Sequence, residues 1–308
     1  MSKYVAAVDL GATSGRICLG WLEEDLLKLE EIYRFSHEAV SKDGNLYWQW
    51  DYIVDEVIKG LKEARKRGEL ASIGVDFWAV DYGLLDADNN LVNTPRCYRD
   101  SRADKYFEAI PKELTPEYIY GKTGIQFLFF NTLYQLVAEK NEGNLNKANK
   151  FLMLPDLLNF ILCGSQTNEI TNASTTQLLN AFTKDWDWEL IERVGLPKEV
   201  FPKLHQPGVF LGNVRGFDEL DGTPVYSVGS HDTASAVAGT PLDESGTSAY
   251  ISSGTWSLVG LELSEAKTNE LTFKSNITNE LGVADKVRFI RNVSGLWMLE
   301  ESIRYWRK

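Results

Sequence analysis

Three segments of this chain combine residue types that could act on a phosphate or a sugar. The first is Asp9-Leu10-Gly11-Ala12-Thr13-Ser14. Its glycine lets backbone N–H groups approach a phosphate, its hydroxyls add donors, and Asp9 at a strand end suits a metal-bound water. The same residues are typical of an ordinary hairpin turn, so the segment alone leaves both interpretations open.

The second segment, Ser230-His231-Asp232-Thr233, places a carboxylate where a strand passes into a helix, a junction that gathers ligands in α/β sheets. Asp232 could accept the proton of a substrate hydroxyl that attacks a phosphoryl group. It equally suits the N-cap of a helix beginning at Thr233, and spacing alone favours the cap. His231 is one of three histidines, and a single histidine is more often structural than catalytic.

The third segment, Asp76-Phe77-Trp78-Ala79-Val80-Asp81, sets two carboxylates around a tryptophan after a buried strand. Sugars bind to such mixtures, because the C–H face of the ring packs on an aromatic side chain while the hydroxyls bond to carboxylates. The alternative is a core tryptophan between two solvated loop aspartates.

Hydrophobic periodicity predicts the elements that position these segments. Strands are expected at 4–9, 16–21, 26–35, 72–75 and 82–86, and a helix from residue 51 with Asp51 as its N-cap. Short helices are expected at 117–120, 131–139, 155–162 and 186–194. A strand at 225–228 and a helix at 233–238 follow. This order predicts an α/β fold.

Glycine and proline residues within 239–246 interrupt helices and strands, so this stretch predicts a domain boundary. The N-terminal domain is then expected at 1–240 and a second domain at 241–308. The run 249–263, with its Gly254-Thr255 turn, repeats the opening strand–turn–strand unit. The repeat predicts a duplicated unit facing across a cleft. A strand at 287–293 and a helix at 296–306 end the chain.

Composition limits the partners. The net charge of −12 over 308 residues argues against nucleic acid and anionic membranes, but not against a nucleotide whose charge a metal ion screens. No stretch reaches the length of a membrane helix, and no secretory apolar region opens the chain, so a cytoplasmic location is expected. Cys18, Cys97 and Cys163 are too scattered to predict a disulfide or a zinc site.

Collinear segments along nearly the whole chain resemble the FGGY family of carbohydrate kinases, and within it the kinases of L-rhamnulose. Their positions are 9–16, 124–128, 130–136, 171–178, 230–237, 252–257 and 276–280. The resemblance implies the actin-like, ribonuclease-H-like ATPase fold, with a complete N-terminal domain and the start of a second similar domain. It further implies phosphorylation of L-rhamnulose at the 1-hydroxyl, with ATP and Mg²⁺ as cofactors.

By position, the resemblance implies that Asp232 is the general base and that Asp9 lies beside the metal ion. The sugar contacts that it implies are Ala79, His231, Asp232, Thr233 and Asn292. The nucleotide contacts that it implies are Ala12, Thr13, Ser14, Gly15, Arg16, Thr255 and Glu300. The partners are then a sugar and ATP, with the oligomeric state open between a monomer and a homodimer.

Two positions depart from the family pattern. Ala79 stands where the family has glycine, so its methyl narrows the pocket or shifts a backbone that needs positive φ. Glu300 stands in place of glutamine and adds negative charge near the nucleotide. The chain is also shorter than family members, which predicts a truncated second domain, poor affinity for ATP and weak or no kinase activity for these 308 residues.

Three other interpretations stay open at this level. The nearest is a kinase of another ketose, such as fuculose or xylulose. The second is a non-catalytic remnant that binds a sugar or a nucleotide, and the third is an actin-like ATPase that forms filaments.

Overall fold

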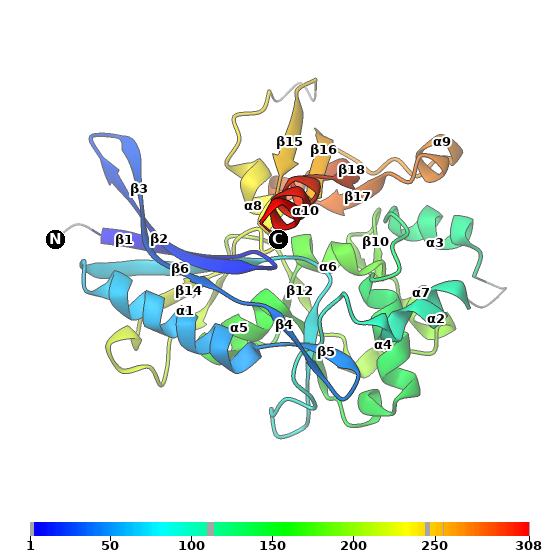
Figure 1. Ribbon diagram of the computed structural model, residues 1–308, viewed down its shortest axis with the longest axis horizontal. Helices are drawn as coiled ribbons and strands as arrows, with labels where there is room; N and C mark the ends of the chain where they lie inside the picture. The colour runs from blue at the N-terminus through cyan, green and yellow to red at the C-terminus, as the bar shows by residue number, and fades with distance from the viewer. Residues whose placement is uncertain (1–2, 110–113, 244–246, 255, 308) are drawn as a thin grey trace.

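The computed structural model describes residues 3–109, 114–243, 247–254 and 256–307. Figure 1 shows two separate sheets with a helical region beside them. The larger sheet has the strand order β13-β14-β6-β1-β2-β3. Its strands are β1 (Lys3–Leu10), β2 (Ser14–Glu23), β3 (Leu26–Ser36), β6 (Glu69–Phe77), β13 (Phe210–Asn213) and β14 (Pro224–Tyr226). The expected strands at 4–9, 16–21, 26–35 and 72–75 are confirmed.

The first sheet joins an antiparallel meander to parallel strands. β1 pairs antiparallel with β2, and β2 pairs antiparallel with β3. On its other side β1 runs parallel to β6, which runs parallel to β14. The β1–β6 register sets Asp9 directly opposite Asp76, so both carboxylates lie at the same edge of the sheet. This α/β arrangement agrees with the prediction from the sequence.

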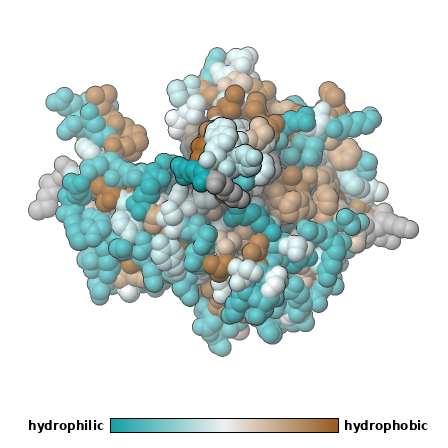
Figure 2. Space-filling model, viewed as in Figure 1, coloured by the Kyte–Doolittle hydropathy of each residue, from teal (hydrophilic) through white to brown (hydrophobic). Residues whose placement is uncertain are grey.

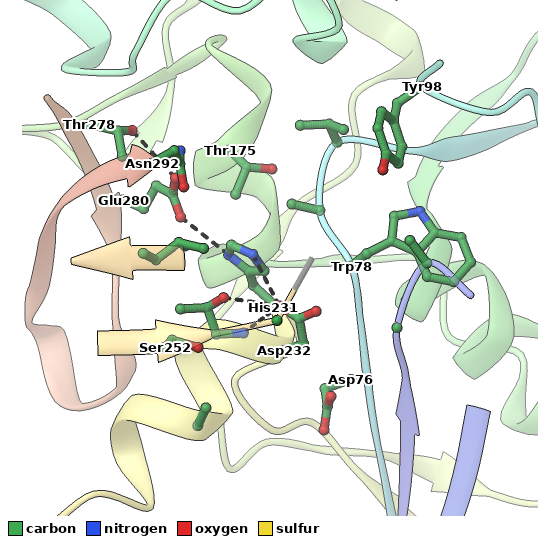
Figure 3. Close-up of a pocket in the computed structure, with 18 of the residues that line it drawn as sticks. Asp76, Trp78, Tyr98, Thr175, His231, Asp232, Ser252, Thr278, Glu280 and Asn292 are labelled. Carbon is green, nitrogen blue, oxygen red and sulfur yellow. Dashed lines mark hydrogen bonds and ion pairs between the residues drawn. The ribbon is translucent and has the colours of Figure 1, made fainter. Parts of the chain in front are cut away.

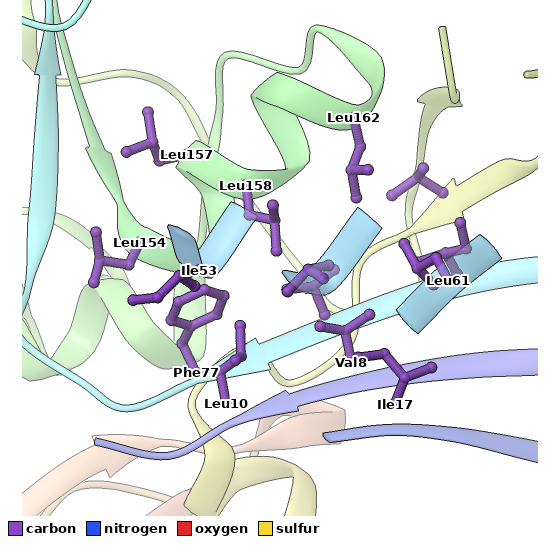
Figure 4. Packing of buried hydrophobic residues seen from close by; sticks show 14 of the residues in the cluster. Val8, Leu10, Ile17, Ile53, Leu61, Phe77, Leu154, Leu157, Leu158 and Leu162 are labelled. Atoms are coloured by element: carbon purple, nitrogen blue, oxygen red, sulfur yellow. The ribbon is translucent and has the colours of Figure 1, made fainter. Parts of the chain in front are cut away.

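Two helices cover one face of this sheet, α1 (Trp50–Arg65) and α5 (Leu154–Cys163). Alternate residues of β1 (Ala6, Val8 and Leu10) are buried under them because side chains alternate between the faces of a strand. Figure 4 shows the apolar faces of both helices meeting the strands in one core. The prediction of Asp51 as N-cap is wrong: the helix begins at Trp50, so Asp51 lies in the first turn. A carboxylate there still interacts favourably with the helix dipole.

The middle of the chain forms a second core from short helices and small strand pairs. Its elements are α2 (Asp104–Glu108), α3 (Pro116–Thr123), α4 (Thr132–Asn141), α6 (Ile170–Ala173), α7 (Trp188–Arg193), β7 (Tyr82–Leu85), β8 (Lys150–Met153), β9 (Asn168–Glu169), β10 (Leu179–Asn180), β11 (Asp185–Trp186) and β12 (Leu204–His205). A separate hairpin, β4 (Ala39–Lys42) and β5 (Asn45–Trp48), precedes α1. The 3-10 turns lie at Ser101–Ala103, Asn144–Asn146, Ser174–Thr176, Lys198–Val200, Asp218–Leu220 and Val283–Asp285. The helix expected at 186–194 starts later, because Asp187 caps it by accepting from the Leu190 N–H.

The second sheet has the order β15-β16-β18-β17. Its strands are β15 (Ala249–Ser253), β16 (Trp256–Leu263), β17 (Thr278–Leu281) and β18 (Val287–Ser294), accompanied by α8 (Asp232–Ala238), α9 (Glu270–Lys274) and α10 (Trp297–Trp306). Helix α8 starts one residue before the predicted helix. The fourth strand, β17, was not predicted.

Apolar side chains also lie on the surface. Figure 2 shows a group at the tip of the β2–β3 hairpin, at the upper left, where Leu22, Leu26, Leu27 and Leu29 are exposed. The start of α10 is exposed as well, at Trp297 and Met298. Among the described residues no helix has both the length and the apolar character to cross a bilayer.

Candidate active site

A cavity of about 570 Å³ lies where the first sheet, the middle region and the second sheet meet. Figure 3 shows side chains from all three parts directed into it. It is lined by Asp9, Gly11, Ala12, Thr13, Arg16, Asp76, Trp78, Ala79, Val80, Tyr98, Ile125, Gln126, Leu128, Phe130, Asn131, Thr175, His231, Asp232, Thr233, Ser235, Ala236, Ser252, Ser253, Gly254, Leu258, Thr278, Glu280 and Asn292. The lining includes most of the residues that the sequence singled out, drawn from segments more than 200 positions apart.

The first hairpin turn closes one end of the cavity. The Gly11 N–H donates to the Ser14 carbonyl at 3.0 Å, and the His37 ring contacts the Gly11 carbonyl at 2.8 Å. Gly11, Ala12 and Thr13 line the cavity, whereas Ser14 and Gly15 do not. Gly15 is buried behind the turn: a Cβ there would lie 2.2 Å from the Leu10 side chain. Position 15 therefore requires glycine because the core leaves no room there for a side chain.

Asp9 and Arg16 lie opposite each other on β1 and β2 and form an ion pair beside this turn. The guanidinium of Arg16 donates to Asp9 Oδ2, with 2.7 Å from Nε, and this bond raises the pKa of Arg16. Both side chains keep part of their surface open. A charged pair at a cavity edge can exchange its partner for a phosphate or a cation at little cost, because exposed ion pairs contribute little stability.

Three carboxylates face this end of the cavity: Asp9, Asp76 and Asp232. Burial raises the pKa of Asp76 well above its ordinary value, and the charges of Asp9 and Asp232 raise it further. Like charges at close range favour the protonated form of one member. The described residues contain no cluster of three or more ligating side chains that could hold a metal ion by themselves.

Asp232 is the first residue of α8, and its backbone follows a loop attached to the first sheet. The Phe77 N–H donates to the Ser230 carbonyl at 2.9 Å, which continues the β6 edge into this loop. Asp232 Oδ1 accepts from the N–H and the hydroxyl of Thr233. His231 Nε2 lies 3.3 Å from the same oxygen.

The surroundings of Asp232 change the pKa of its carboxyl. Its side chain keeps 36% of its surface open to the cavity, but protein surrounds it elsewhere. Burial raises the pKa of Asp232, while His231 and the bonds from Thr233 act in the opposite direction. A carboxyl with a raised pKa is a better proton acceptor than an ordinary one, provided that it is ionised.

Glu169 fixes the loop that carries His231 and Asp232. It is fully buried, and its Oε2 accepts from the N–H of Ser230 at 2.9 Å and from the hydroxyl of Ser230 at 2.8 Å. The same carboxylate caps α6 by accepting from the N–H groups of Thr171 and Asn172. Sequence reasoning missed Glu169. The one signal for it was its position just before the 171–178 segment.

An aromatic wall faces the polar side of the cavity. Trp78, Tyr98 and Phe130 form it, with Trp78 only 5% exposed. Asp81 lies behind the wall, completely buried, and its Oδ2 accepts from the indole N–H groups of Trp48 at 2.6 Å and Trp78 at 3.0 Å. Burial raises the pKa of Asp81 to about 6. The interpretation of Asp81 as a solvated loop residue is wrong.

Ala79 lines the cavity, but the backbone strain falls on its neighbour. Val80 has φ +66°, whereas Ala79 is not among the described residues with positive φ. A β-branched residue rarely adopts this conformation. The Val80 carbonyl accepts from the Thr132 hydroxyl at 2.7 Å, which holds it in place. The positive φ that was considered for residue 79 is therefore found at residue 80.

The remaining predicted residues divide into two groups. Thr233 and Asn292 line the cavity, and the Asn292 amide donates to Gln126 Oε1 at 2.8 Å. Thr255 lies outside the described residues, and so does the side chain of Glu300. Sequence reasoning assigned no role to Gln126, Glu280 and Tyr98, although the first two fall in the segments that carried the resemblance.

Comparison with known proteins gives the family. Residues 4–239 match the model of the FGGY family of carbohydrate kinases, N-terminal domain. The chain is 45% identical over 305 residues to a rhamnulokinase of Ligilactobacillus salivarius, covering 97% of this chain and 62% of that protein. It is 42% identical over 300 residues to a rhamnulokinase of Bacillus subtilis, covering 96% and 61%. The chain thus spans less than two thirds of the length of these curated relatives.

Solved structures agree on the fold. A xylulose kinase from Lactobacillus acidophilus superposes with a TM-score of 0.83 at 20% identity, covering 94% of this chain and 60% of that one. A Plasmodium falciparum glycerol kinase with ADP superposes with a TM-score of 0.78 at 15% identity, covering 98% and 64%. The chain has the actin-like ATPase fold of sugar kinases, as the sequence predicted.

Proposed function

Because this chain belongs to the FGGY family of carbohydrate kinases, we propose that it forms the sugar-binding part of an ATP-dependent kinase that phosphorylates L-rhamnulose at its 1-hydroxyl. Relatives named as rhamnulokinases, 42% to 45% identical over nearly the whole chain, support this choice of sugar. The observation that carries the proposal is the convergence of Asp232, His231 and the first hairpin turn on one cavity.

In the proposed reaction the sugar lies between two unlike walls. Its C–H face packs against Trp78 and Tyr98, and its hydroxyls face the polar groups of His231 and Asn292. Asp232 accepts the proton of the attacking hydroxyl through Oδ2, because Oδ1 already accepts the two bonds from Thr233. The positions of these groups supply orientation, which is most of what phosphoryl transfer asks of a protein.

The phosphates of ATP would lie at the first hairpin turn. The backbone at Gly11, Ala12 and Thr13 is open to the cavity, and Arg16 can turn from Asp9 to a phosphate oxygen. Mg²⁺ suits carboxylate, phosphate and water oxygens, so Asp9 fits as its protein-side residue while the phosphates and waters supply the other ligands. The ion would neutralise charge that a chain with a net charge of −12 does not. The roles of Ser14, Gly15, Thr255 and Glu300, the domain boundary after residue 240 and the cytoplasmic location stay predictions.

The test is a panel of ketoses assayed by coupled detection of ADP, on the 308-residue chain and on the complete product of its gene. We expect L-rhamnulose to react with the highest kcat/KM. Asp232→Asn should lower kcat at least about 10²-fold, because removal of a general base has that effect. Asp88→Asn, in an exposed loop, is the matched control. A preference for fuculose or xylulose would refute the substrate assignment, and an unchanged rate for Asp232→Asn would refute the role of the base.

Binding of the sugar without turnover is the alternative that a test must separate from the kinase. Titration calorimetry with L-rhamnulose separates the two. Binding of the sugar without ADP formation by the complete gene product would establish a binding protein in place of a kinase.

A further inference from the structure

Arg288 is completely buried beside the cavity, in a position where a guanidinium needs strong partners. It is the second residue of β18. Its Nε and Nη2 donate to the Leu281 carbonyl at 3.1 and 3.0 Å. Nη2 also lies 3.0 Å from His231 Nδ1 and 3.2 Å from Glu280 Oε2. The second sheet therefore reaches directly to the residue that precedes Asp232.

Glu280, on β17, completes this contact. Its Oε2 lies 3.2 Å from His231 Nδ1, and its side chain is 8% exposed. Burial acts to raise the pKa of Glu280, but the charge of Arg288 and the proximity of His231 outweigh it and hold that pKa below its ordinary value. Glu280 is thus the anion that balances the buried guanidinium. Figure 3 shows the His231 ring between Glu280 on one side and Asp232 on the other.

The identity of these partners determines where His231 carries its proton. A guanidinium is a donor only, so the ring nitrogen that it contacts, Nδ1, acts as the acceptor. A neutral imidazole that accepts at Nδ1 carries its proton on Nε2. Nε2 is the nitrogen that faces Asp232 Oδ1, at 3.3 Å. If Nδ1 carried the proton, an N–H would point at the donor groups of Arg288. Glu280 Oε2 lies 3.2 Å from the same nitrogen but has no hydrogen-bond partner among the described residues, whereas Arg288 Nη2 makes a hydrogen bond to Nδ1.

We propose that Arg288 is a positioning residue that holds His231 in the Nε2–H tautomer, and that His231 in turn fixes Asp232 as a carboxylate with Oδ2 directed to the sugar. Oδ1 accepts the two bonds from Thr233, and His231 Nε2 lies 3.3 Å from the same oxygen. Among the described residues no hydrogen bond uses Oδ2. The inference rests on the proposed kinase function only for its effect on turnover.

The informative variant removes both buried charges together. Arg288→Met alone would leave Glu280 as an uncompensated buried anion, a change that commonly costs about 3–5 kcal/mol and could unfold the chain. The double variant Arg288→Met/Glu280→Gln keeps the side-chain volumes and leaves no charge unpaired. The matched control is Arg291→Met, the same substitution at an exposed position of the same strand.

The first readout is the ¹⁵N spectrum of the histidine rings, which reports the tautomer without any need for activity. The chain has three histidines, so His37→Asn and His205→Gln assign the His231 signals. We expect the Nε2–H tautomer in the wild type and in Arg291→Met, and a mixture of both tautomers in the folded double variant. An unchanged tautomer in the folded double variant would overturn the proposal, as would an Nδ1–H ring in the wild type.

The second readout is turnover of the complete gene product. We expect the double variant to lower kcat for the ketose at least about tenfold, with KM for ATP changed less than twofold, because the base is misplaced while the nucleotide side is intact. Arg288→Lys, which keeps a donor, should recover part of the loss. Equal losses in kcat and in stability for Arg288→Lys and the double variant would mean a structural role. If the wild type phosphorylates no ketose, the proposed function fails while the tautomer measurement still decides the role of Arg288.

Discussion

The two strand–turn–strand hairpins reach the same cavity but have very different support. β1–β2 presents Gly11, Ala12 and Thr13, and β15–β16 presents Ser252 and Gly254. Behind β1–β2 lies the large core under α1 and α5. Behind β15–β16 lies a small cluster of buried residues, Val237, Tyr250 and Ile290, with Leu242 and Leu258 packed against it. The first hairpin is fixed by its own core, whereas the second has little of one.

The second sheet is held mainly through β17 and the middle region. The Asn279 N–H donates to the Gly124 carbonyl at 2.9 Å, and the Tyr120 hydroxyl donates to the Ile277 carbonyl at 2.7 Å. Leu281 and Val287 belong to the core of the middle region. On the opposite side of the sheet, Ile251 is 68% exposed. The difference teaches that the sugar side of the cavity is built as one unit with its own cores, to which the second sheet attaches along β17 and β18.

The largest effect that tests this comparison is a matched pair of core truncations. Ile53 and Ile290 are both fully buried, the first in the large core and the second in the small cluster. We expect Ile53→Ala to lower the free energy of unfolding by about 4 kcal/mol and Ile290→Ala by about 2 kcal/mol. The smaller loss is expected for Ile290 because its few neighbours can move more readily into the space that the truncated side chain leaves. Urea denaturation followed by tryptophan fluorescence measures both. Equal losses would show that the second sheet is as rigid as the first.

Two buried carboxylates, one in each half, should give opposite pH dependences. The folded-state pKa of Asp81 is about 6, above its unfolded value, so its contribution to stability is complete below about pH 4 and is lost as the pH rises through 6. The loss at pH 7 is on the order of 3 kcal/mol. The pKa of Glu280 is lowered, so its contribution is present above about pH 4.5 and is lost as the pH falls through the folded value.

Urea midpoints from pH 4 to 7 check these signs. Relative to the wild type, Asp81→Asn should become more stable as the pH rises, since asparagine keeps an oxygen for the two indole donors and carries no buried charge. The double variant Arg288→Met/Glu280→Gln, which leaves no buried charge unpaired, should become less stable relative to the wild type over the same range. Asp104→Asn, at an exposed site, is the control. Parallel curves for Asp81→Asn and the wild type would contradict the raised pKa of Asp81.

The first sheet could be predicted from the sequence because its pattern is local. Strands such as Lys3–Leu10 alternate buried and exposed residues, and α1 repeats its apolar positions every three to four residues. The short strand Thr278–Leu281 has all four residues buried, so it shows no alternation. Its existence depends on pairing with β18 and on contacts with residues more than 100 positions away.

The candidate site was predictable in part for the same reason. Spacing alone favoured Asp232 as a helix cap, and the resemblance to the family was needed to single it out. The cap prediction is wrong: His231 holds the N-cap position of α8 without a side-chain cap bond, and Asp232 is the first residue of the helix and faces the cavity. Glu169 and Glu280 were marked only by lying beside or within a segment that carried the resemblance, and Arg288 was not marked at all. Their importance lies in partners on distant segments, 57 and 61 positions away from the loop at 230 and 231 for Arg288 and Glu169.

The smallest structural change that tests the comparison is the addition of a single methyl group to glycines of the two hairpins. In the first, a Cβ on Gly15 would lie 2.2 Å from Leu10 and 2.5 Å from Phe35. In the second, a Cβ on Gly260 would lie 2.9 Å from the Tyr250 ring and 3.0 Å from the Phe289 carbonyl. Overpacking costs about 1–3 kcal/mol. We expect Gly15→Ala at the upper end and Gly260→Ala near the lower end, because the ring of Tyr250 has few neighbours to hold it.

Gly11→Ala is the control for this pair, since its Cβ would meet only the Ser14 carbonyl, at an ordinary 3.7 Å. It should change the free energy of unfolding by less than about 0.5 kcal/mol, as substitutions away from packed sites do. Thermal and urea unfolding of the three variants, measured side by side, give the ranking. An equal loss of stability for Gly260→Ala and Gly15→Ala would mean that the residues packed behind both hairpins resist movement to the same degree. The contrast between the two halves of the cavity would then rest on the exposed face of the second sheet alone.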